Sequence, residues 1–217
     1  MTSKYDPWKN ALVWFAETAH SVWRPGKVLK HEPSSEKAEW TFIIELDVKA
    51  MEGGAEHSEP VPLEQFTIVT PPMDHFFLEF VSVKKRDKDP SNALQISDMT
   101  SLSFLNEPEM IECLRTRYFA NYIYTDIGPI LVAMNPYEQL GGGVYSTDTI
   151  EKYFQADHGE LKRLGPHVFQ ISNSAYGRMF VDKFDADKRE NQSILVNGES
   201  GAVSIVLCSL VMCCCMG

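Results

Sequence analysis

Cysteine is scarce through most of this chain. Five cysteines occur among 217 residues, and only Cys113 lies outside the last ten positions. A disulfide framework needs paired cysteines spread through the fold, so this pattern excludes a disulfide-stabilised scaffold and favours a reducing compartment. The opening residues, MTSKYDPWKN, contain neither the long apolar core nor the small-residue cleavage pattern of a secretory signal.

Basic residues are also few. The chain has 20 lysines and arginines against 30 aspartates and glutamates, which gives a net charge of −10. This balance argues against nucleic-acid binding and against attraction to an anionic membrane. Because 44% of the residues are hydrophobic, the composition is that of a globular protein rather than a disordered one. We therefore expect a soluble, acidic cytoplasmic protein.

Residues 1–82 contain short runs rich in aromatic and β-branched residues, separated by turn signals. The runs LVWFA, SVWRPGKVLK, EWTFIIEL and EQFTIVT are typical of strands, and several short strands without long helices predict a small β-barrel. We interpret Trp14, Trp23 and Trp40 as barrel core rather than as a peptide-binding groove, because aromatic side chains supply most of the burial in so small a core. The charged run at 83–92 is typical of a solvated linker.

Residues 93–202 alternate between helix and strand patterns. Helices are predicted at NEPEMIECLRTRYFAN, with Asn106 as N-cap, at STDTIEKYFQ, with Ser146 or Thr147 as N-cap, and at HVFQISNSAYGRMFVDKFDADK. IYTDIGPILVAM contains a nearly continuous apolar run, as a buried strand would, and QSILVNG is predicted to be a strand that runs into a glycine-rich turn. This alternation predicts an α/β sheet. The last segment, 203–217, is an uncharged apolar tail unlike the rest of the chain.

The segment SILVNGESGA, residues 193–202, carries the strongest chemical signal. Gly198 and Gly201 follow the predicted strand, as a phosphate-binding loop requires, because backbone N–H groups converge on an anion only where the chain turns tightly. The full pattern is G-x-x-x-x-G-K-[ST], but positions 203–205 hold valine, serine and isoleucine. From this motif alone, a simple strand-ending turn is the plainer interpretation.

Four segments together extend this signal. QSILVNGESGA resembles the strand and phosphate loop of myosin heads, where the loop reads GESGAGKT. DMTSLSFLNEPEMIECLRTRY resembles the family's entry helix, NYIYTDIGPILVAMNPYEQL its first strands and purine-contacting turn, and HVFQISNSAYGRMF the helix that leads toward the loop. The segments follow family order and spacing over residues 97–202. The resemblance implies an α/β fold, with part of a P-loop motor-head sheet and its helices preceded by a small Src-homology-3-like β-barrel.

The resemblance also implies roles for individual residues. Asn135 and Pro136 match the Asn-Pro pair that lies along the adenine, although a simple strand-ending turn is the alternative interpretation. Tyr145 resembles the tyrosine that follows, on a connection that the glycines at 141–143 make longer than usual. The phosphate-binding residues are matched by Gly198, Glu199, Ser200, Gly201 and Ala202. Asn173 stands where many family members have aspartate, and we interpret it as a solvated helix residue.

The family is an actin-activated Mg-ATPase that works on actin filaments, with ATP and Mg²⁺ as cofactors and a cytoplasmic, cytoskeleton-associated location. Its loop lysine neutralises the β- and γ-phosphates, and the next residue, a serine or threonine, holds Mg²⁺. Here Ser204 and Ile205 stand at those positions. We therefore expect no catalytic residue and no metal ligand in this chain, and we do not expect it to be a competent motor.

We interpret residues 203–217 as aberrant sequence that leaves its reading frame or enters an intron after Ala202. A membrane anchor is the less favoured interpretation, since a bilayer span needs about 20 apolar residues and no basic residue flanks the tail. The functional alternative to a truncated motor is a genuine short product, a non-catalytic adaptor or interaction module with a β-barrel domain. A transcript that continues with Gly-Lys-Thr supports the motor, and a verified stop after Gly217 supports the adaptor.

Overall fold

The computed structural model describes residues 8–18, 21–33, 39–47, 64–70, 82–87, 92–138, 141, 143–179 and 191–198. The chain divides into two compact units, one from Met1–Asn92 with Leu102–Cys113 and one from Ala93–Ser101 with Leu114–Gly217. Helix α3, Glu107–Phe119, begins in the first unit and ends in the second. Within the described ranges, no helix is both long enough and apolar enough to cross a membrane.

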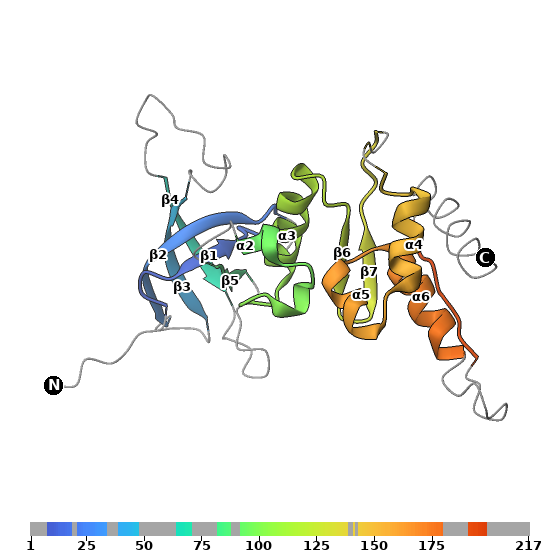
Figure 1. Cartoon of the computed structure of the whole chain (residues 1–217). Helices are drawn as coiled ribbons and strands as arrows, with labels where there is room; N and C mark the ends of the chain where they lie inside the picture. Colours follow the sequence, from blue (N-terminus) through green and yellow to red (C-terminus); the bar gives the residue numbers. More distant parts are fainter. Residues whose placement is uncertain are drawn as a thin grey trace. The chain divides into compact units, whose positions relative to one another are not determined.

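A five-stranded antiparallel sheet forms the first unit (Figure 1). The strands lie in the order β4-β3-β2-β1-β5. They span Leu12–Phe15 (β1), Arg24–Pro33 (β2), Trp40–Leu46 (β3), Gln65–Thr70 (β4) and Val83–Lys85 (β5). Strands β1 to β4 confirm the four runs that the sequence predicts, and the sheet is consistent with the expected Src-homology-3-like domain.

The core of this sheet follows the two-residue period of its strands. Val13 and Phe15 on β1, and Phe42 and Ile44 on β3, are each 0% exposed, because alternate side chains of a strand point to the same face. Trp8 belongs to this cluster and meets Phe42 edge to face, with ring centroids 5.7 Å apart. The apolar face of each strand therefore fixes its register in the sheet.

The tryptophan prediction holds only in part. Trp40 packs against the core cluster, whereas Trp14 is buried with its indole N–H bonded to Glu109. Trp23 is half-buried and is not a member of the cluster. The tryptophan that is a buried member of the core cluster is Trp8, which the sequence analysis did not single out. It lies in the turn that precedes β1.

The predicted linker at 83–92 is wrong for its first residues. Val83–Lys85 forms β5 and pairs with β1, with Phe15 opposite Val83 and Val13 opposite Lys85. Val83 is 0% exposed and belongs to the core cluster, so this apolar side chain and the pairing with β1 both hold the strand in the sheet. Arg86 is also buried and forms an ion pair with Asp47, where the charge pattern predicted a solvated residue.

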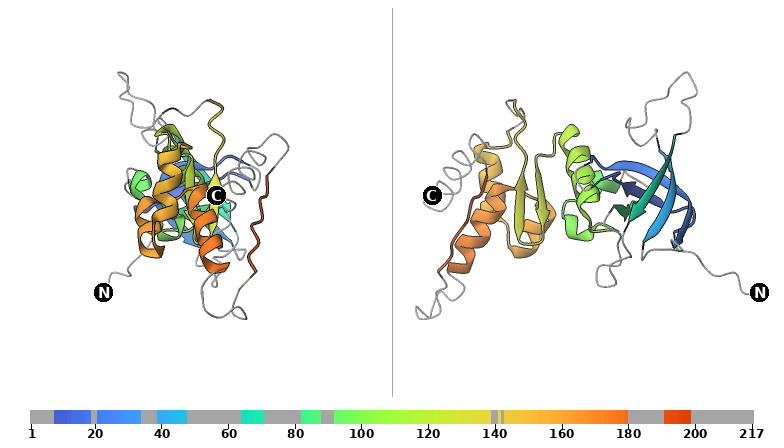
Figure 2. Two further views of the ribbon diagram at one scale, coloured as in Figure 1. Left: turned by 45° about the vertical axis from the view of Figure 1, so that its right-hand side comes forward. Right: turned by 180° about the vertical axis from the view of Figure 1, so that it is seen from behind.

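The second unit combines a β-hairpin with short helices. Its elements are α2 (Asn92–Gln95), η1 (Met99–Ser101), the end of α3, β6 (Tyr124–Ile127), β7 (Ile130–Ala133), α4 (Thr147–Gln155), α5 (His158–Leu164) and α6 (Val168–Met179). Helices α4 and α6 lie side by side in each view of Figures 1 and 2. The buried cluster of this unit consists of Ile123, Tyr124, Tyr153, Leu161, Val168 and Phe169.

The predicted helix starts are confirmed. Asn106 Oδ1 accepts a hydrogen bond of 3.1 Å from the N–H of Glu109, as an N-cap does. Of the two candidates before α4, Ser146 is the cap, and its side chain accepts from the N–H of Thr149 at 3.2 Å. Both helices therefore begin where a side-chain oxygen satisfies a backbone donor that has no helical partner.

Two strand predictions are wrong in detail. The run IYTDIGPILVAM is not one buried strand but the antiparallel hairpin β6–β7, which turns at Gly128 with φ of 56°, a value that glycine adopts at low cost. The predicted strand in QSILVNG has no regular secondary structure at 192–198 and no strand partner among the described residues. A strand needs a neighbour to pair its N–H and C=O groups, so apolar residues alone do not produce one.

Candidate functional site

Asn135 and Pro136, the predicted adenine contacts, form a rigid turn at the end of β7. Oδ1 of Asn135 accepts a hydrogen bond of 2.9 Å from the N–H of Tyr137, which closes an Asx-type turn. The hydroxyl of Tyr118, on α3, donates to the carbonyl of Pro136 at 3.2 Å. Tyr137 has φ of 54° and is 89% exposed. The turn is thus held from both sides, while the tyrosine after it faces solvent.

Tyr145, the third predicted adenine contact, lies just before α4 and is half-buried. Its hydroxyl lies 2.8 Å from the hydroxyl of Tyr124 on β6. Its ring packs against the start of α6, with centroids 5.9 Å from His167 and 6.3 Å from Phe169. The ring of Tyr145 is therefore held both by a polar contact at its tip and by aromatic contacts on its sides.

His167 lies at the centre of this aromatic group. Its ring centroid is 4.9 Å from those of Tyr124 and Tyr153, and its Nδ1 accepts a hydrogen bond of 3.1 Å from the N–H of Phe169. Burial lowers the pKa of His167 to about 4, and the carbonyl of Val144 opposes this only in part. The imidazole is therefore neutral at pH 7 and serves to cap α6.

The sequence analysis did not single out Tyr124 or His167, although a local pattern marks each of them. His167 follows Gly165-Pro166 and comes immediately before a helical pattern, which is where a helix begins. Tyr124 lies in the β-branched and aromatic run that starts at Ile123 and predicts a strand.

Asn173 corrects one interpretation. Its Nδ2 donates to the carbonyls of Tyr153 and Ala156, at 2.6 Å and 3.1 Å. These carbonyls belong to the end of α4, where helices leave C=O groups without partners. The residue is half-buried, so it is not a solvated helix residue as expected. The departure from the family's aspartate thus supplies an N–H donor that aspartate lacks.

The phosphate end of the predicted site is described only at Gly198. This residue is exposed and has no regular secondary structure, and Glu199, Ser200, Gly201 and Ala202 lie outside the described residues. Among the described residues, no hydrogen bond or ring contact joins Asn135 or Tyr145 to Gly198. The roles of these residues therefore remain predictions.

The fit to the expected cofactor differs between its two ends. At the expected purine end, Tyr145 offers a half-buried aromatic ring, and Asn135 offers a side-chain amide in a closed turn. At the phosphate end the sequence offers Val203, Ser204 and Ile205, so it supplies neither a positive charge nor a hydroxyl at the Mg²⁺ position. The described residues contain no cluster of three or more side chains suited to a metal ion. The residues present therefore do not fit a magnesium-bound triphosphate.

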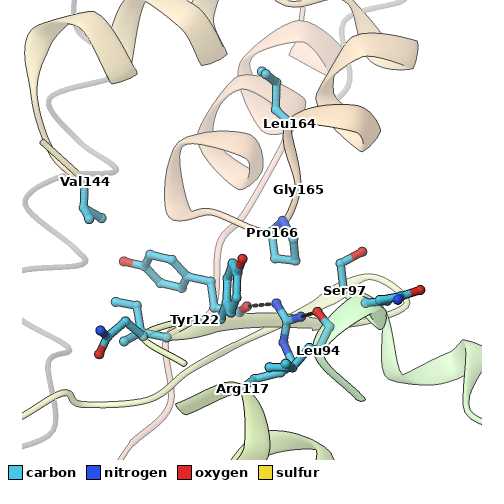
Figure 3. A pocket seen from close by; sticks show the side chains of 12 residues that line it. Leu94, Ser97, Arg117, Tyr122, Val144, Leu164, Gly165 and Pro166 are labelled. Atoms are coloured by element: carbon cyan, nitrogen blue, oxygen red, sulfur yellow. Dashed lines mark hydrogen bonds between the residues drawn. The ribbon is translucent and has the colours of Figure 1, made fainter. Parts of the chain in front are cut away.

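A pocket of about 280 Å³ lies elsewhere in the second unit (Figure 3). Arg117 is 3% exposed and donates to Thr125 Oγ1 at 2.9 Å and to the carbonyls of Leu94 and Tyr124 at 3.1 Å and 3.0 Å. The pocket is lined by Leu94, Gln95, Ser97, Arg117, Asn121, Tyr122, Ile123, Tyr124, Val144, Leu164, Gly165 and Pro166. None of the predicted nucleotide-binding residues lines this pocket. The guanidinium of Arg117 already donates hydrogen bonds to two backbone carbonyls and a threonine hydroxyl.

Two carboxylates lie close together beside this region. Asp98 and Asp126 form a parallel backbone bridge, and the side chain of Asp98 accepts hydrogen bonds from Thr100 and from the N–H of Gly128. Burial raises the pKa of Asp98, but these hydrogen bonds outweigh it and lower the pKa overall. Burial and the charge of Asp98 raise the pKa of Asp126 to about 6. The pair has one low and one high pKa because hydrogen bonds outweigh burial at Asp98, whereas burial and the charge of Asp98 outweigh the hydrogen bond from Gln170 at Asp126.

Known proteins similar to this chain are myosins. Myosin-5 of Arabidopsis thaliana is 46% identical over 107 residues, which are 49% of this chain and 6% of the relative. Myosin-15 of the same plant is 40% identical over 136 residues, 61% of this chain and 8% of the relative. Unconventional myosin-Vb of Homo sapiens is 38% identical over 126 residues, 58% of this chain and 6% of the relative. The chain thus spans less than a tenth of these relatives.

The family described as "Myosin head (motor domain)" matches residues 96–215, which is more than half of the chain. The match begins near Asp98, as the resemblance of DMTSLSFLNEPEM predicted, and it continues beyond Ala202 into the apolar tail. It contains the turn at Asn135, the aromatic group around Tyr145 and the glycine-rich loop. The chain therefore belongs to the myosin head family.

Proposed function

We propose that this chain is part of an actin-based motor head, with a purine end and a phosphate end that does not support hydrolysis. The purine end consists of Asn135, Pro136 and Tyr145, and the phosphate end of the loop at 198–202. Family membership and the fixed turn and tyrosine support the first assignment. The sequence Val-Ser-Ile at 203–205 carries the second.

The energetic reason lies in how phosphoryl transfer is catalysed. The protein contributes positioning and charge stabilisation, and in this family the loop lysine and the Mg²⁺-bound hydroxyl provide much of both. Ser204 is neutral, and Ile205 has no oxygen ligand. A few neutral hydrogen bonds, each worth about 1 kcal/mol, do not offset the cost of immobilising ATP. We therefore expect weak binding or none, and no hydrolysis above background.

Isothermal titration of Mg-ATP, paired with a phosphate-release assay with and without actin filaments, tests this proposal. Restoring the loop by Val203→Gly, Ser204→Lys and Ile205→Thr should increase Mg-ATP affinity. A matched variant with Ser204→Met in place of Ser204→Lys keeps a long side chain without the charge and should not. Micromolar binding or actin-stimulated release by the unaltered chain would show that the loop is functional as it stands.

A second candidate is a non-catalytic adaptor or interaction module. The observation that favours it is the first unit, whose five-stranded sheet has a buried core of its own. The transcript distinguishes the two. Sequencing that finds a Gly-Lys-Thr continuation after Ala202 supports the motor, whereas a stop after Gly217 in mature transcripts supports the adaptor.

A further inference from the structure

Tyr124 is the residue that holds the predicted purine contact Tyr145. The two hydroxyl oxygens are 2.8 Å apart, a normal length for a hydrogen bond between hydroxyl groups. Tyr124 is 5% exposed, whereas Tyr145 is only half-buried. One partner of the pair is therefore almost fully buried, and the other is partly exposed.

Burial favours one direction for this hydrogen bond. A buried hydroxyl that donates to nothing leaves its hydrogen unpaired, and an unpaired buried donor is costly. Tyr145 is the hydrogen-bond partner that the structure gives to the hydroxyl of Tyr124, and the geometry allows either hydroxyl to donate. If Tyr145 donated, the hydrogen of Tyr124 would have no acceptor in this contact. We therefore assign the more buried Tyr124 as the donor and Tyr145 as the acceptor.

This direction leaves Tyr145 with its own hydrogen and one oxygen lone pair. Contacts with His167 and Phe169, at 5.9 Å and 6.3 Å between centroids, restrain the ring. A purine ring presents hydrogen-bond acceptors along its edge. A tyrosine whose ring is restrained and whose O–H is not used in the contact with Tyr124 is suited to donate to one of them.

We propose that Tyr124 is a positioning residue for purine binding, which acts by orienting the hydroxyl of Tyr145 as a donor. This inference rests on the proposed function, since it needs Tyr145 to contact the base. It adds a residue that touches no nucleotide itself. Its substitution should weaken purine binding through Tyr145 alone.

Saturation-transfer NMR with adenosine as the probe tests the proposal on the full chain, because it detects dissociation constants on the order of 1 mM. Tyr124→Phe removes one hydroxyl and should weaken adenosine binding by about threefold to tenfold, the usual effect of one hydrogen bond. Tyr145→Phe should weaken it at least as much. The double variant should be no weaker than Tyr145→Phe, since both changes remove the same bond.

Tyr153→Phe is the matched control. Tyr153 belongs to the same buried cluster, and its hydroxyl donates to the carbonyls of Leu164 and Gly165 rather than to Tyr145. This variant should lower stability but leave adenosine affinity unchanged. Spectra of isotope-labelled tyrosine without any purine give a second measurement, in which the Tyr145 ring signal should shift in Tyr124→Phe and not in Tyr153→Phe.

The outcomes separate the two proposals. If the unaltered chain shows no saturation transfer to adenosine, the proposed purine site is overturned, and so is the proposed role of Tyr124. If the unaltered chain binds and Tyr124→Phe binds equally well, only the positioning role is overturned. Additive losses in the double variant would also contradict that role, since they would show that Tyr124 acts independently of Tyr145.

Discussion

The indole N–H of Trp14 donates a hydrogen bond of 2.6 Å to Oε2 of Glu109, which lies 95 positions further along the chain. The other oxygen of Glu109 accepts from the N–H of Asp87 at 3.3 Å, and the guanidinium of Arg86 lies 5.6 Å from the ring of Trp14. Burial raises the pKa of Glu109, although both hydrogen bonds act against it. The start of α3 is thus attached to β1 through a buried carboxylate.

Trp14→Phe should destabilise the first unit by about 1–3 kcal/mol, because it leaves Oε2 of Glu109 buried without its donor. The measurement is the urea midpoint of unfolding. Trp23→Phe is the control, since Trp23 is half-buried and lies outside the core cluster. Equal losses in the two variants would mean that the Trp14–Glu109 bond contributes nothing beyond ring burial.

We expect opposite effects on stability when Gly26 and Gly177 are each replaced by alanine. A Cβ at Gly26 would lie 2.5 Å from Cγ2 of Ile44 and 2.9 Å from the carbonyl of Glu45, so Gly26→Ala should destabilise by about 1–3 kcal/mol. A Cβ at Gly177, on α6, meets nothing within 4 Å. Gly177→Ala should therefore stabilise by about 0.5–1 kcal/mol through helix propensity.

Thermal unfolding of the two variants checks this pair, and each serves as the control for the other. A raised melting temperature for Gly26→Ala would show that β2 and β3 are not packed as closely as the sheet requires. A lowered melting temperature for Gly177→Ala would show that α6 does not continue through that position.

Asn173→Asp should destabilise the second unit by about 1–3 kcal/mol. The aspartate loses both hydrogen bonds to the carbonyls of Tyr153 and Ala156 and brings a negative charge to the end of α4, where the helix dipole is also negative. Ser174→Asp places the same charge one residue away and should cost less. Chemical unfolding of both variants decides the matter, and the prediction fails if Asn173→Asp is as stable as the unaltered chain.

Sequence reasoning was most successful where local chemistry decides the structure. The strands at LVWFA and EWTFIIEL and the caps Asn106 and Ser146 depend on neighbouring residues, so their patterns are visible in the sequence. The hairpin turn at Gly128 was missed although Asp126 and the Gly128-Pro129 pair interrupt the apolar run at that point. Family resemblance placed the turn at Asn135, but it gave no account of what holds that turn.

The missed features of the candidate site are contacts between distant residues. Tyr124 meets Tyr145 across 21 positions, and Asn173 reaches Tyr153 across 20. No periodicity or spacing rule links such pairs, because only the packed fold brings them together. The wrongly predicted strand at QSILVNG illustrates the same limit, since its apolar residues do not specify a neighbour with which to pair.

Asp126 predicts an unusual pH dependence of stability. Its pKa is raised from 3.8 to about 6 by burial and by the charge of Asp98, while Gln170 and Arg117 oppose the shift. The folded state therefore holds this proton more tightly than the unfolded state. The stabilisation is complete below pH 4 and is lost as the pH rises through 6. At pH 7 the half-buried carboxylate is ionised and disfavoured.

Asp126→Asn mimics the protonated form, so it should raise the urea midpoint at pH 7 and have little effect near pH 4. The difference between variant and unaltered chain should appear between pH 4 and pH 6, because that is where Asp126 titrates in one state and not in the other. Glu151→Gln, at an exposed position of α4, is the control and should change the midpoint at pH 7 by less than Asp126→Asn does. A destabilising effect of Asp126→Asn at pH 7 would show that the attraction of Arg117 outweighs burial and the repulsion from Asp98.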